Sequence, residues 1–196
     1  ILVEDERIIQ VGNTDTVAVP DGYEVISTEA MTVLPGLWEM HAHLMLNGHA
    51  DYDHWHPTYM DRMEDEIMPA SAVQLLLAGV TTARDLGAPL EMSLSIRDRI
   101  NDGTLPGPRL FVSGPFLQHR TRPGAENYRW GINGEREARA RVNELADAGV
   151  DVIKLIDQDE MSVAEATALV DQAHQRGLRV VAHSHRPNEI LSGLEI

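Results

Sequence analysis

The sequence predicts an α/β protein in which parallel strands alternate with helices and close into a (β/α) barrel. Five apolar, strand-like runs recur from residue 35 onward, and segments with helical periodicity separate them. The runs are apolar throughout, as in parallel strands that helices cover on both faces. Polar residues follow several of these runs, which is where barrel enzymes place their active sites. No dinucleotide glycine fingerprint or phosphate loop is present, which disfavours an open, doubly wound sheet.

The predicted elements follow one another in a regular order. The strand runs are 37–44, 80–83, 110–113, 150–156 and 178–183. One helix has an apolar face made of Ala138, Val142, Leu145 and Ala146, and Gly149 stops it. A second helix begins at a capping box, Ser162 with Glu165, and ends at Gly177. Its predicted buried stripe consists of Val163, Ala166, Leu169, Val170 and Ala173.

Residues 1–34 differ from the rest and are expected to form a small β-subdomain. Two short apolar runs, 1–3 and 7–11, flank a turn at Asp5 and Glu6. Residues 23–26 alternate as a third strand should, after a turn at Pro20, Asp21 and Gly22. We therefore expect two domains, residues 1–34 and residues 35–196.

Composition restricts the partners and the chemistry. With 16 basic and 31 acidic residues, the formal net charge is −15, so we expect neither nucleic acid nor a membrane surface as a partner. No apolar run of about 18 residues is present to predict a transmembrane helix. Cysteine is absent, which removes disulfides, thiolate nucleophiles and zinc fingers. Any metal must be held mainly by imidazole or carboxylate, and nine histidines are available.

The chain begins at Ile1 without a basic-then-apolar leader. A leader lost with a missing N-terminus would leave the same sequence. The cytoplasm is therefore expected only as the default location.

His41 and His43 lie two residues apart in the first strand run. Side chains two apart on a strand point to the same side, so the two imidazoles are close enough to hold one cation. A pair of core or loop histidines that are satisfied by hydrogen bonds would give the same pattern. Both interpretations stay open at this point.

Lys154 lies inside an apolar run, where a charged amine is costly unless it is paired or neutralised. Snorkelling, or a salt bridge to Asp151 or Asp157, would resolve this cost. Alternatively, burial lowers the lysine pKa and frees the amine to capture carbon dioxide. The resulting carbamate is an anionic oxygen ligand that can bridge two metal ions about 3.5–4 Å apart.

His183 ends the fifth strand run, and His185 follows two residues later. Either could be a metal ligand, and His185 could instead orient one. We favour His183 because it is nearer to the strand. A structural histidine at this position is the alternative.

Taken together, the strand-end segments resemble the amidohydrolase superfamily. The similar segments are 34–43, with the motif His41-Ala42-His43, and 79–87, 107–114, 152–154 and 181–183. They occur in the family's order over almost the whole chain, and they are most similar to the imidazolonepropionase-like and Xaa-Pro dipeptidase-like branch. The resemblance implies a TIM-type (β/α)8 barrel, incomplete here with about five βα units. It also implies that residues 1–34 are part of a small β-sandwich.

The resemblance further implies a set of ligands for two divalent metal ions, with zinc expected. His41 and His43 would bind one ion, His183 would bind the second, and carboxylated Lys154 would bridge them. Lys154 is thereby the one catalytic residue that we expect in this chain. The imidazolonepropionases proper lack this lysine, so Lys154 argues against that activity.

Two family features are not found in the sequence. Family members carry a further histidine on the sixth strand and an aspartate on the eighth, and this chain stops at Ile196, after the fifth. We therefore expect an incomplete sequence, or a second chain that supplies the remainder. The family's Asp-Gly-Arg hairpin turn also reads Asp5-Glu6-Arg7 here.

Other polar residues are weaker candidates. Arg84 and Asp85 end the second run and either orient a ligand or substrate or form an internal ion pair. His119 lies in a long loop, residues 115–133, and is expected to contact substrate. A loop after the first strand, expected to line the pocket or to be solvated, holds His49, His54, Trp55, His56 and Tyr59. We expect Met60, Met63 and Met68 to pack a helix, and we assign His174 no role.

The expected activity is hydrolysis of an amide or peptide-like C–N bond in a small molecule by a metal-activated hydroxide. Within the resemblance, we expect a dipeptidase or carboxypeptidase. Carbamate or phenylurea hydrolysis, lactone opening and deamination are alternatives. Two alternatives of another class remain open. One is a decarboxylase or isomerase on the same scaffold, and the other is an inactive fragment or subunit. We expect a homo-oligomer, or a second chain that completes the barrel.

Overall fold

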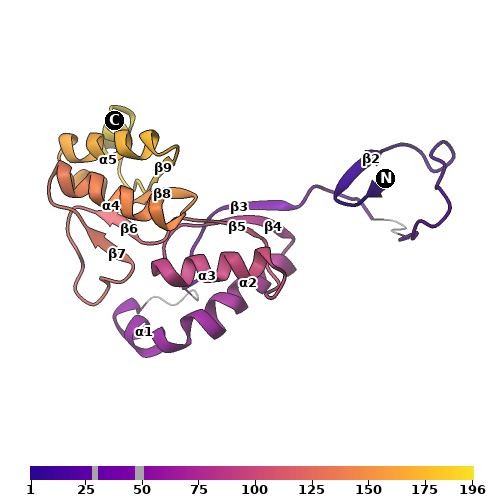
Figure 1. The fold of residues 1–196 in the computed structure, drawn as a ribbon, viewed down its shortest axis with the longest axis horizontal. Helices are drawn as coiled ribbons and strands as arrows, with labels where there is room; N and C mark the ends of the chain where they lie inside the picture. The colour runs from indigo at the N-terminus through magenta and orange to yellow at the C-terminus, as the bar shows by residue number, and fades with distance from the viewer. Residues whose placement is uncertain (28–30, 47–50) are drawn as a thin grey trace. The chain divides into compact units, whose positions relative to one another are not determined.

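The computed structural model describes residues 1–27, 31–46 and 51–196 (Figure 1). The chain divides into two compact units, Ile1–Pro35 and Gly36–Ile196. The boundary falls one residue beyond the one expected from the sequence. Of the histidines singled out above, His49 lies outside the described residues.

The first unit contains one antiparallel strand pair, β1 (Leu2–Glu4) with β2 (Arg7–Gln10). The turn between them places Asp5 at a φ of 52°, a left-handed conformation that aspartate tolerates better than most residues. The expected strand at residues 23–26 is wrong: these residues form no strand. Alternation alone does not make a strand, because a strand needs a partner to satisfy its backbone.

The second unit contains seven strands among its described residues, and all their pairings are parallel. They are β3 (Leu37–Ala42), β4 (Val80–Asp85), β5 (Arg109–Val112), β6 (Phe116–Gln118), β7 (Arg129–Gly131), β8 (Val152–Leu155) and β9 (Arg179–Ala182). One sheet has the order β3-β4-β5 and the other β7-β6-β8-β9. The amide of Asp151, at the start of β8, donates to the carbonyl of Val112 at the end of β5 over 2.8 Å, which links the two sheets.

The third predicted strand, 110–113, is confirmed as β5, and a further short strand, β6, follows it. β5 ends at Val112, Gly114 adopts a left-handed φ of 63°, and β6 begins at Phe116. β6 then pairs with β8 through Leu117 and Leu155. The predicted loop 115–133 is therefore wrong in part, because it contains β6 and, paired alongside it, β7. Glycine makes this break possible because it adopts left-handed backbone angles readily.

Helices and helical turns separate the strands. They are α1 (Tyr52–Tyr59), η1 (Met60–Arg62), η2 (Met63–Ile67), α2 (Met68–Leu77), α3 (Leu90–Asn101), α4 (Glu135–Ala148), η3 (Gln158–Glu160), α5 (Val163–Gln175) and α6 (Pro187–Leu194). The loop expected around Trp55 and His56 is wrong, because these residues lie in α1. Asp51 caps that helix by accepting a hydrogen bond from the amide of His54 over 3.1 Å.

The two helices predicted in detail are confirmed. α4 ends at Gly149, whose φ of 88° is left-handed. α5 begins at a capping box in which the Ser162 hydroxyl accepts from the Glu165 amide and the Glu165 carboxylate accepts from the Ser162 amide. One position of the predicted stripe is wrong: Val163 is 62% exposed, whereas Glu165 and Ala166 in the same turn are buried.

Two apolar clusters hold the strands against the helices. One contains buried side chains of α2, α3, β4 and β5, with Met63 and Met68 fully buried, as expected for helix packing. The other lies between β6 and β8 on one side and α4 and α5 on the other. Burial on both sides explains why the strands are almost continuously apolar.

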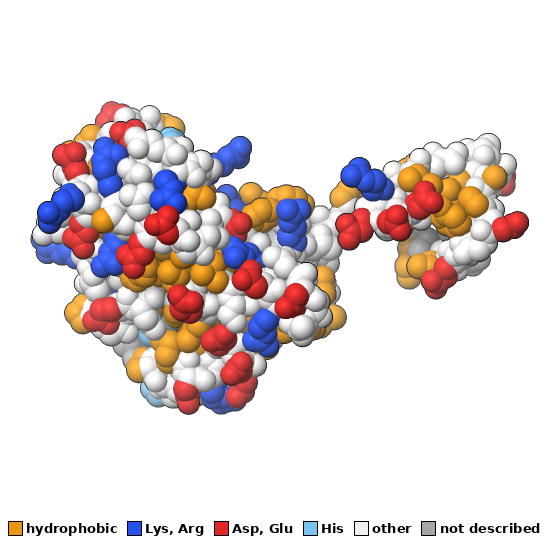
Figure 2. Space-filling model, viewed as in Figure 1, with side chains coloured by type: hydrophobic (Ala, Val, Ile, Leu, Met, Phe, Trp, Pro, Cys, Tyr) orange, Lys and Arg blue, Asp and Glu red, His pale blue; other side chains and the backbone are white. Residues whose placement is uncertain are grey.

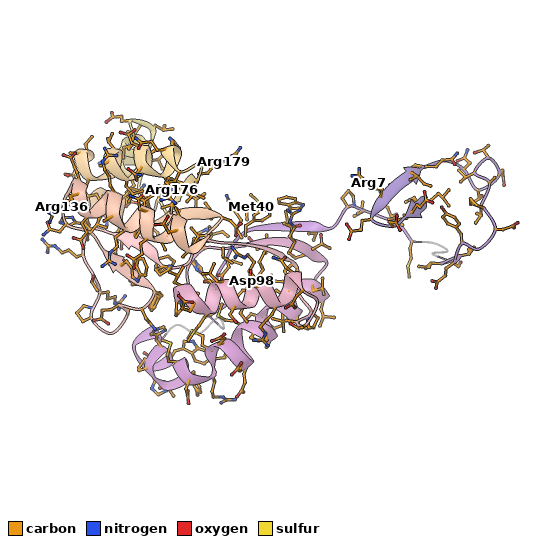
Figure 3. All side chains as sticks on the ribbon, viewed as in Figure 1. Arg7, Met40, Asp98, Arg136, Arg176 and Arg179 are labelled. Carbon is orange, nitrogen blue, oxygen red and sulfur yellow. The ribbon has the colours of Figure 1, made fainter. Side chains whose placement is uncertain are left out.

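The second unit is the part of a TIM-type (β/α)8 barrel predicted from the sequence, with five barrel strands in the order β3, β4, β5 with β6, β8 and β9. β3 and β9 are its outer strands, and β3 exposes Leu37 and Trp38. Acidic and basic side chains are interspersed on the visible surface (Figure 2), and Arg136 extends outward from the first turn of α4 (Figure 3). In the described part of the chain, no helix combines the length and the apolar character needed to cross a membrane.

Candidate active site

The residues predicted as ligands come together at the C-terminal ends of β3, β8 and β9. The His41 ring centroid lies 5.1 Å from that of His43 and 5.1 Å from that of His183. The Lys154 Nζ atom lies 3.5 Å from His41 Nε2. Parallel strands explain this arrangement, because their C-terminal ends meet at one edge. The alternation of side chains on each strand then selects which residues face the centre.

Lys154 is the only lysine in the sequence, and it is buried. Burial, and then the nearby Arg84 guanidinium, lower the pKa of its amine to about 8. Asp151, one of the expected salt-bridge partners, instead pairs with Arg97 over 3.3 Å and accepts from the Val112 amide. The salt bridge to Asp151 is therefore wrong. A buried amine with a lowered pKa is nucleophilic enough to capture carbon dioxide.

The three imidazoles share this electrostatic environment. Burial lowers the pKa of His43 to about 4, with further lowering from His41 and Lys154. Burial and the Lys154 charge also lower the pKa values of His41 and His183. All three rings are therefore neutral at pH 7. Neutral imidazole is the form that binds a metal ion.

The donor set fits divalent metal ions in its chemistry, although the side chains are not gathered around a common point. Within residues 1–27, 31–46 and 51–196, no group of three or more His, Asp or Glu side chains is arranged to hold a metal ion. The cluster contains three neutral imidazoles and one amine, and it lacks an anionic oxygen. A carbamate on Lys154 would add that oxygen and remove the positive charge that opposes a cation.

Arg84 and Asp85 end β4 but do not pair with each other. The Arg84 Nε atom donates to the Met40 carbonyl over 2.9 Å, which joins β4 to β3 just before His41. Asp85 is fully buried, and its Oδ1 atom accepts from the Leu44 amide over 3.2 Å. Both residues thus hold the segment that carries His41 and His43. The internal ion pair between them, considered as an alternative, is not formed.

His119 and His185 both lie next to buried glutamates. His119 Nδ1 lies 3.4 Å from Glu165 Oε1, at the start of α5. His185 stacks on His183 with ring centroids 4.1 Å apart, and its amide donates to Glu189. His185 lines the pocket described next, and His119 is not among the residues that line it. Contact with His183 is what the expected role of His185, orienting a ligand, requires.

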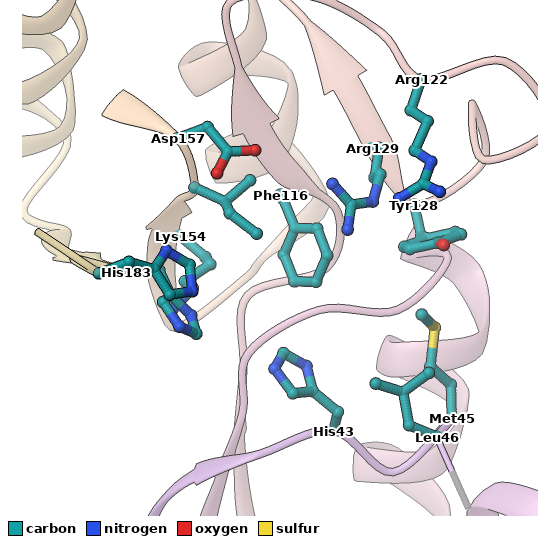
Figure 4. Close-up of a pocket in the computed structure, with 12 residues that line it drawn as sticks. His43, Met45, Leu46, Phe116, Arg122, Tyr128, Arg129, Lys154, Asp157 and His183 are labelled. Carbon is teal, nitrogen blue, oxygen red and sulfur yellow. The ribbon is translucent and has the colours of Figure 1, made fainter. Parts of the chain in front are cut away.

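A pocket of about 440 Å³ opens beside the cluster (Figure 4). Sequence reasoning identified His43, Lys154, His183 and His185 in it. It missed the aromatic and charged residues of the pocket wall, which are Phe116, Arg122, Tyr128, Arg129 and Asp157. Asp157 has a φ of 52°, and no pattern in the sequence predicts this left-handed conformation. The other four come from the segment that was taken as a loop.

Known structures show the same fold. At 30% identity, the chain is similar to a candidate prolidase from Bifidobacterium longum, with a TM-score of 0.64 over 82% of this chain and 37% of that chain. It is similar to ochratoxinase from A. niger at 25% identity, with a TM-score of 0.63 over 82% and 45%. It is also similar to molinate hydrolase at 21% identity, with a TM-score of 0.79 over 95% and 49%. The chain thus spans less than half the length of each.

The curated proteins contain no match to the chain. The family model described as the amidohydrolase family matches residues 32–193. This match covers all five barrel strands and the strand ends where His41, Lys154 and His183 converge. The chain therefore belongs to the amidohydrolase family.

Proposed function

We propose that the protein containing this chain is an enzyme that hydrolyses an amide or peptide-like C–N bond with divalent metal ions. The observation that carries the proposal is that three neutral imidazoles lie together at the strand ends, with His41 beside the one lysine of the chain. His41, His43 and His183 would hold the metal ions, with zinc expected because the donors are imidazole and an anionic oxygen. Lys154 would supply that oxygen as a carbamate.

The chain's own residues bind and orient, and the metal ions supply the activation. When bound, divalent ions lower the pKa of a water molecule towards neutrality and polarise the substrate carbonyl. Lys154 and the imidazoles would hold these ions at the strand ends, beside the pocket. The pocket wall of Phe116 and Tyr128 excludes bulk water from one side of the substrate. The pocket volume of about 440 Å³ suits a small molecule.

A dipeptidase or carboxypeptidase is the specific activity that we propose. The support is the similarity, at 30% identity, to the candidate prolidase. The test of the reaction class uses the complete protein that contains this chain, which should hydrolyse dipeptides and N-acyl amino acids in water labelled with ¹⁸O. A hydrolase incorporates one labelled oxygen into the released acid. Products without label would contradict hydrolysis and favour a decarboxylase or isomerase.

Metal content tests the ligand set directly. The change Lys154→Met keeps most of the buried side-chain volume and removes the amine. We expect bound zinc to fall from about two ions per complete active site to one or none, measured by elemental analysis after dialysis. His174→Ala, on the exposed end of α5, is the matched control and should keep the full metal content. Undiminished zinc in Lys154→Met would contradict the bridging role.

The carbamate has a spectroscopic test that does not depend on activity. Lys154 is the only lysine in this sequence, and ¹³C-labelled bicarbonate should give a side-chain carbamate signal in the NMR spectrum that Lys154→Met removes. Any other amine that reacts remains in Lys154→Met. A spectrum that is unchanged in that variant would exclude carboxylation of Lys154.

A further inference from the structure

The pocket has a second cationic side, formed by Arg122 and Arg129. Figure 4 shows these two side chains across the pocket from Lys154 and His183. Asp157 is the one acidic residue among the described residues that line the pocket. A molecule with a formal net charge of −15 thus contains a pocket in which cationic groups predominate. Such a local reversal of charge attracts an anionic group that the rest of the surface repels.

Arg129 is held in place without all its donors being used. It lies on β7 beside Phe116 of β6, and its guanidinium carbon is 5.4 Å from the Phe116 ring centroid and 5.7 Å from the Tyr128 ring centroid. One terminal nitrogen donates to Gln118 Oε1 over 3.2 Å. Its Nε atom is buried and has no hydrogen-bond partner among the described residues. Leaving such a donor unpaired is costly.

The surrounding residues make this position rigid. Phe116 and Tyr128 are buried and pack edge-to-face with ring centroids 5.8 Å apart. Gly87, with a φ of 151°, allows the Phe116 ring to lie against its backbone, because a Cβ there would be 1.7 Å from the ring. Arg129 therefore rests on a fixed aromatic wall. A guanidinium held in one orientation is suited to the paired hydrogen bonds of a carboxylate.

We propose that Arg129 binds a free carboxylate of the substrate. This inference rests on the proposed function and names its substrate class. The scissile C–N bond would lie at the side of Lys154 and His183, and the carboxylate at the side of Arg129. The substrates are then N-acyl amino acids or dipeptides, with the carboxylate on the amine part that is released.

The test compares N-acetyl-L-leucine with N-acetyl-L-leucinamide, which have the same scissile acetyl bond and differ in the charge of one end. We expect the full chain to prefer the carboxylate. The change Arg129→Gln should raise KM for the carboxylate about 10- to 100-fold, the effect of a lost charge-assisted pair. It should leave KM for the carboxamide within about 3-fold, and kcat for both nearly unchanged, because a binding group acts on KM. Arg129→Lys should restore part of the preference.

Arg141→Gln is the matched control. The Arg141 guanidinium also lies over an aromatic ring, 5.0 Å from the Trp130 centroid, and it does not line the pocket. Its removal should affect neither compound. If Arg129→Gln raises KM for both compounds equally, Arg129 only supports the pocket wall and the proposal is overturned. An unchanged preference for the carboxylate in Arg129→Gln overturns it as well.

Calorimetric binding of the same two compounds separates this inference from the proposed function. If the carboxylate binds better and Arg129→Gln removes that preference, the carboxylate site stands even where neither compound is hydrolysed. If both compounds are hydrolysed but neither binding nor KM depends on Arg129, the hydrolase stands and the carboxylate site is wrong. Equal binding of both compounds to the unaltered chain also overturns the site.

Discussion

At the scale of single residues, the strand ends contain ionisable groups whose pKa values are shifted towards neutral pH. Lys154 is the clearest case, since burial and Arg84 lower its pKa to about 8. Asp85 is the opposite case: burial raises its pKa to about 7, and the hydrogen bond from the Leu44 amide opposes this only in part. The Asp85 Oδ2 atom has no hydrogen-bond partner among the described residues. The amine of Lys154 and the carboxyl group of Asp85 thus have pKa values within about one unit of pH 7.

The change Asp85→Asn tests how much stability the folded chain loses when the buried carboxyl group of Asp85 ionises. The folded pKa of about 7 is above the ordinary value of 3.8, so the folded state holds the proton more tightly. The stability from the protonated form is complete below pH 4 and is lost as the pH rises through 7, by up to about 4 kcal/mol. Asp85→Asn keeps the acceptor for Leu44 and cannot ionise. We expect its stability relative to the unaltered chain to increase from pH 5 to pH 8 in urea unfolding.

Asp171→Asn, on the exposed face of α5, is the control for this measurement. Its side chain is 56% exposed, so its charged carboxylate loses little hydration when the chain folds. Its stability relative to the unaltered chain should change little between the two pH values. If the difference in free energy of unfolding between Asp85→Asn and the unaltered chain is the same at pH 5 and pH 8, Asp85 is ionised in the folded chain at both pH values.

At the scale of elements, the start of α5 connects segments that flank the site. The Glu165 carboxylate accepts from the Ser162 amide over 2.9 Å and from the Gly134 amide over 2.6 Å, and it lies 3.4 Å from His119. One buried carboxylate therefore joins the start of α5, the start of α4 and the segment after β6. The hydrogen bonds lower the pKa of Glu165 and keep it charged.

Ser162→Ala removes one half of this capping box. The Ser162 hydroxyl accepts from the Glu165 amide over 3.2 Å, and its loss should destabilise the chain by about 1 kcal/mol in thermal or urea unfolding. Thr167→Ala, in the middle of the same helix, is the control. It should be neutral or stabilising, because alanine is the better helix former. Equal effects of the two changes would mean that the cap contributes nothing specific.

At the scale of the whole molecule, metal binding should be linked to stability. The proposed ligands come from β3, β8 and β9, which are distant in sequence, so an ion that joins them would bind the folded state and not the unfolded state. Zinc at 100 times its dissociation constant stabilises by about 2.7 kcal/mol, which corresponds to a rise in Tm of about 5–10 °C. His41→Ala should remove this rise, and His174→Ala should keep it. A zinc effect that is the same in both variants would place the metal elsewhere.

The sequence by itself determined the barrel, the positions of its five barrel strands and the meeting of His41, Lys154 and His183 at their ends. These follow from period and order: each strand run has one C-terminal end, and parallel strands bring those ends together. The helices with complete caps, such as α5, were also predictable, because the capping box is local. These predictions needed only the order of the strand runs and the helix caps, and not the length of chain between them.

Tertiary structure alone decided the pocket wall and the partners of the buried charges. Arg129 reaches the pocket because β5 breaks at Gly114 and β7 pairs with β6, a long-range pairing that no local pattern indicates. Asp157 faces the pocket through a left-handed backbone conformation that its neighbours impose. The exposure of Val163 and the absence of a strand at residues 23–26 were also decided by contacts in the folded chain and not by the local sequence. Local patterns report what a segment can form, and the contacts available to it in the folded chain select among these forms.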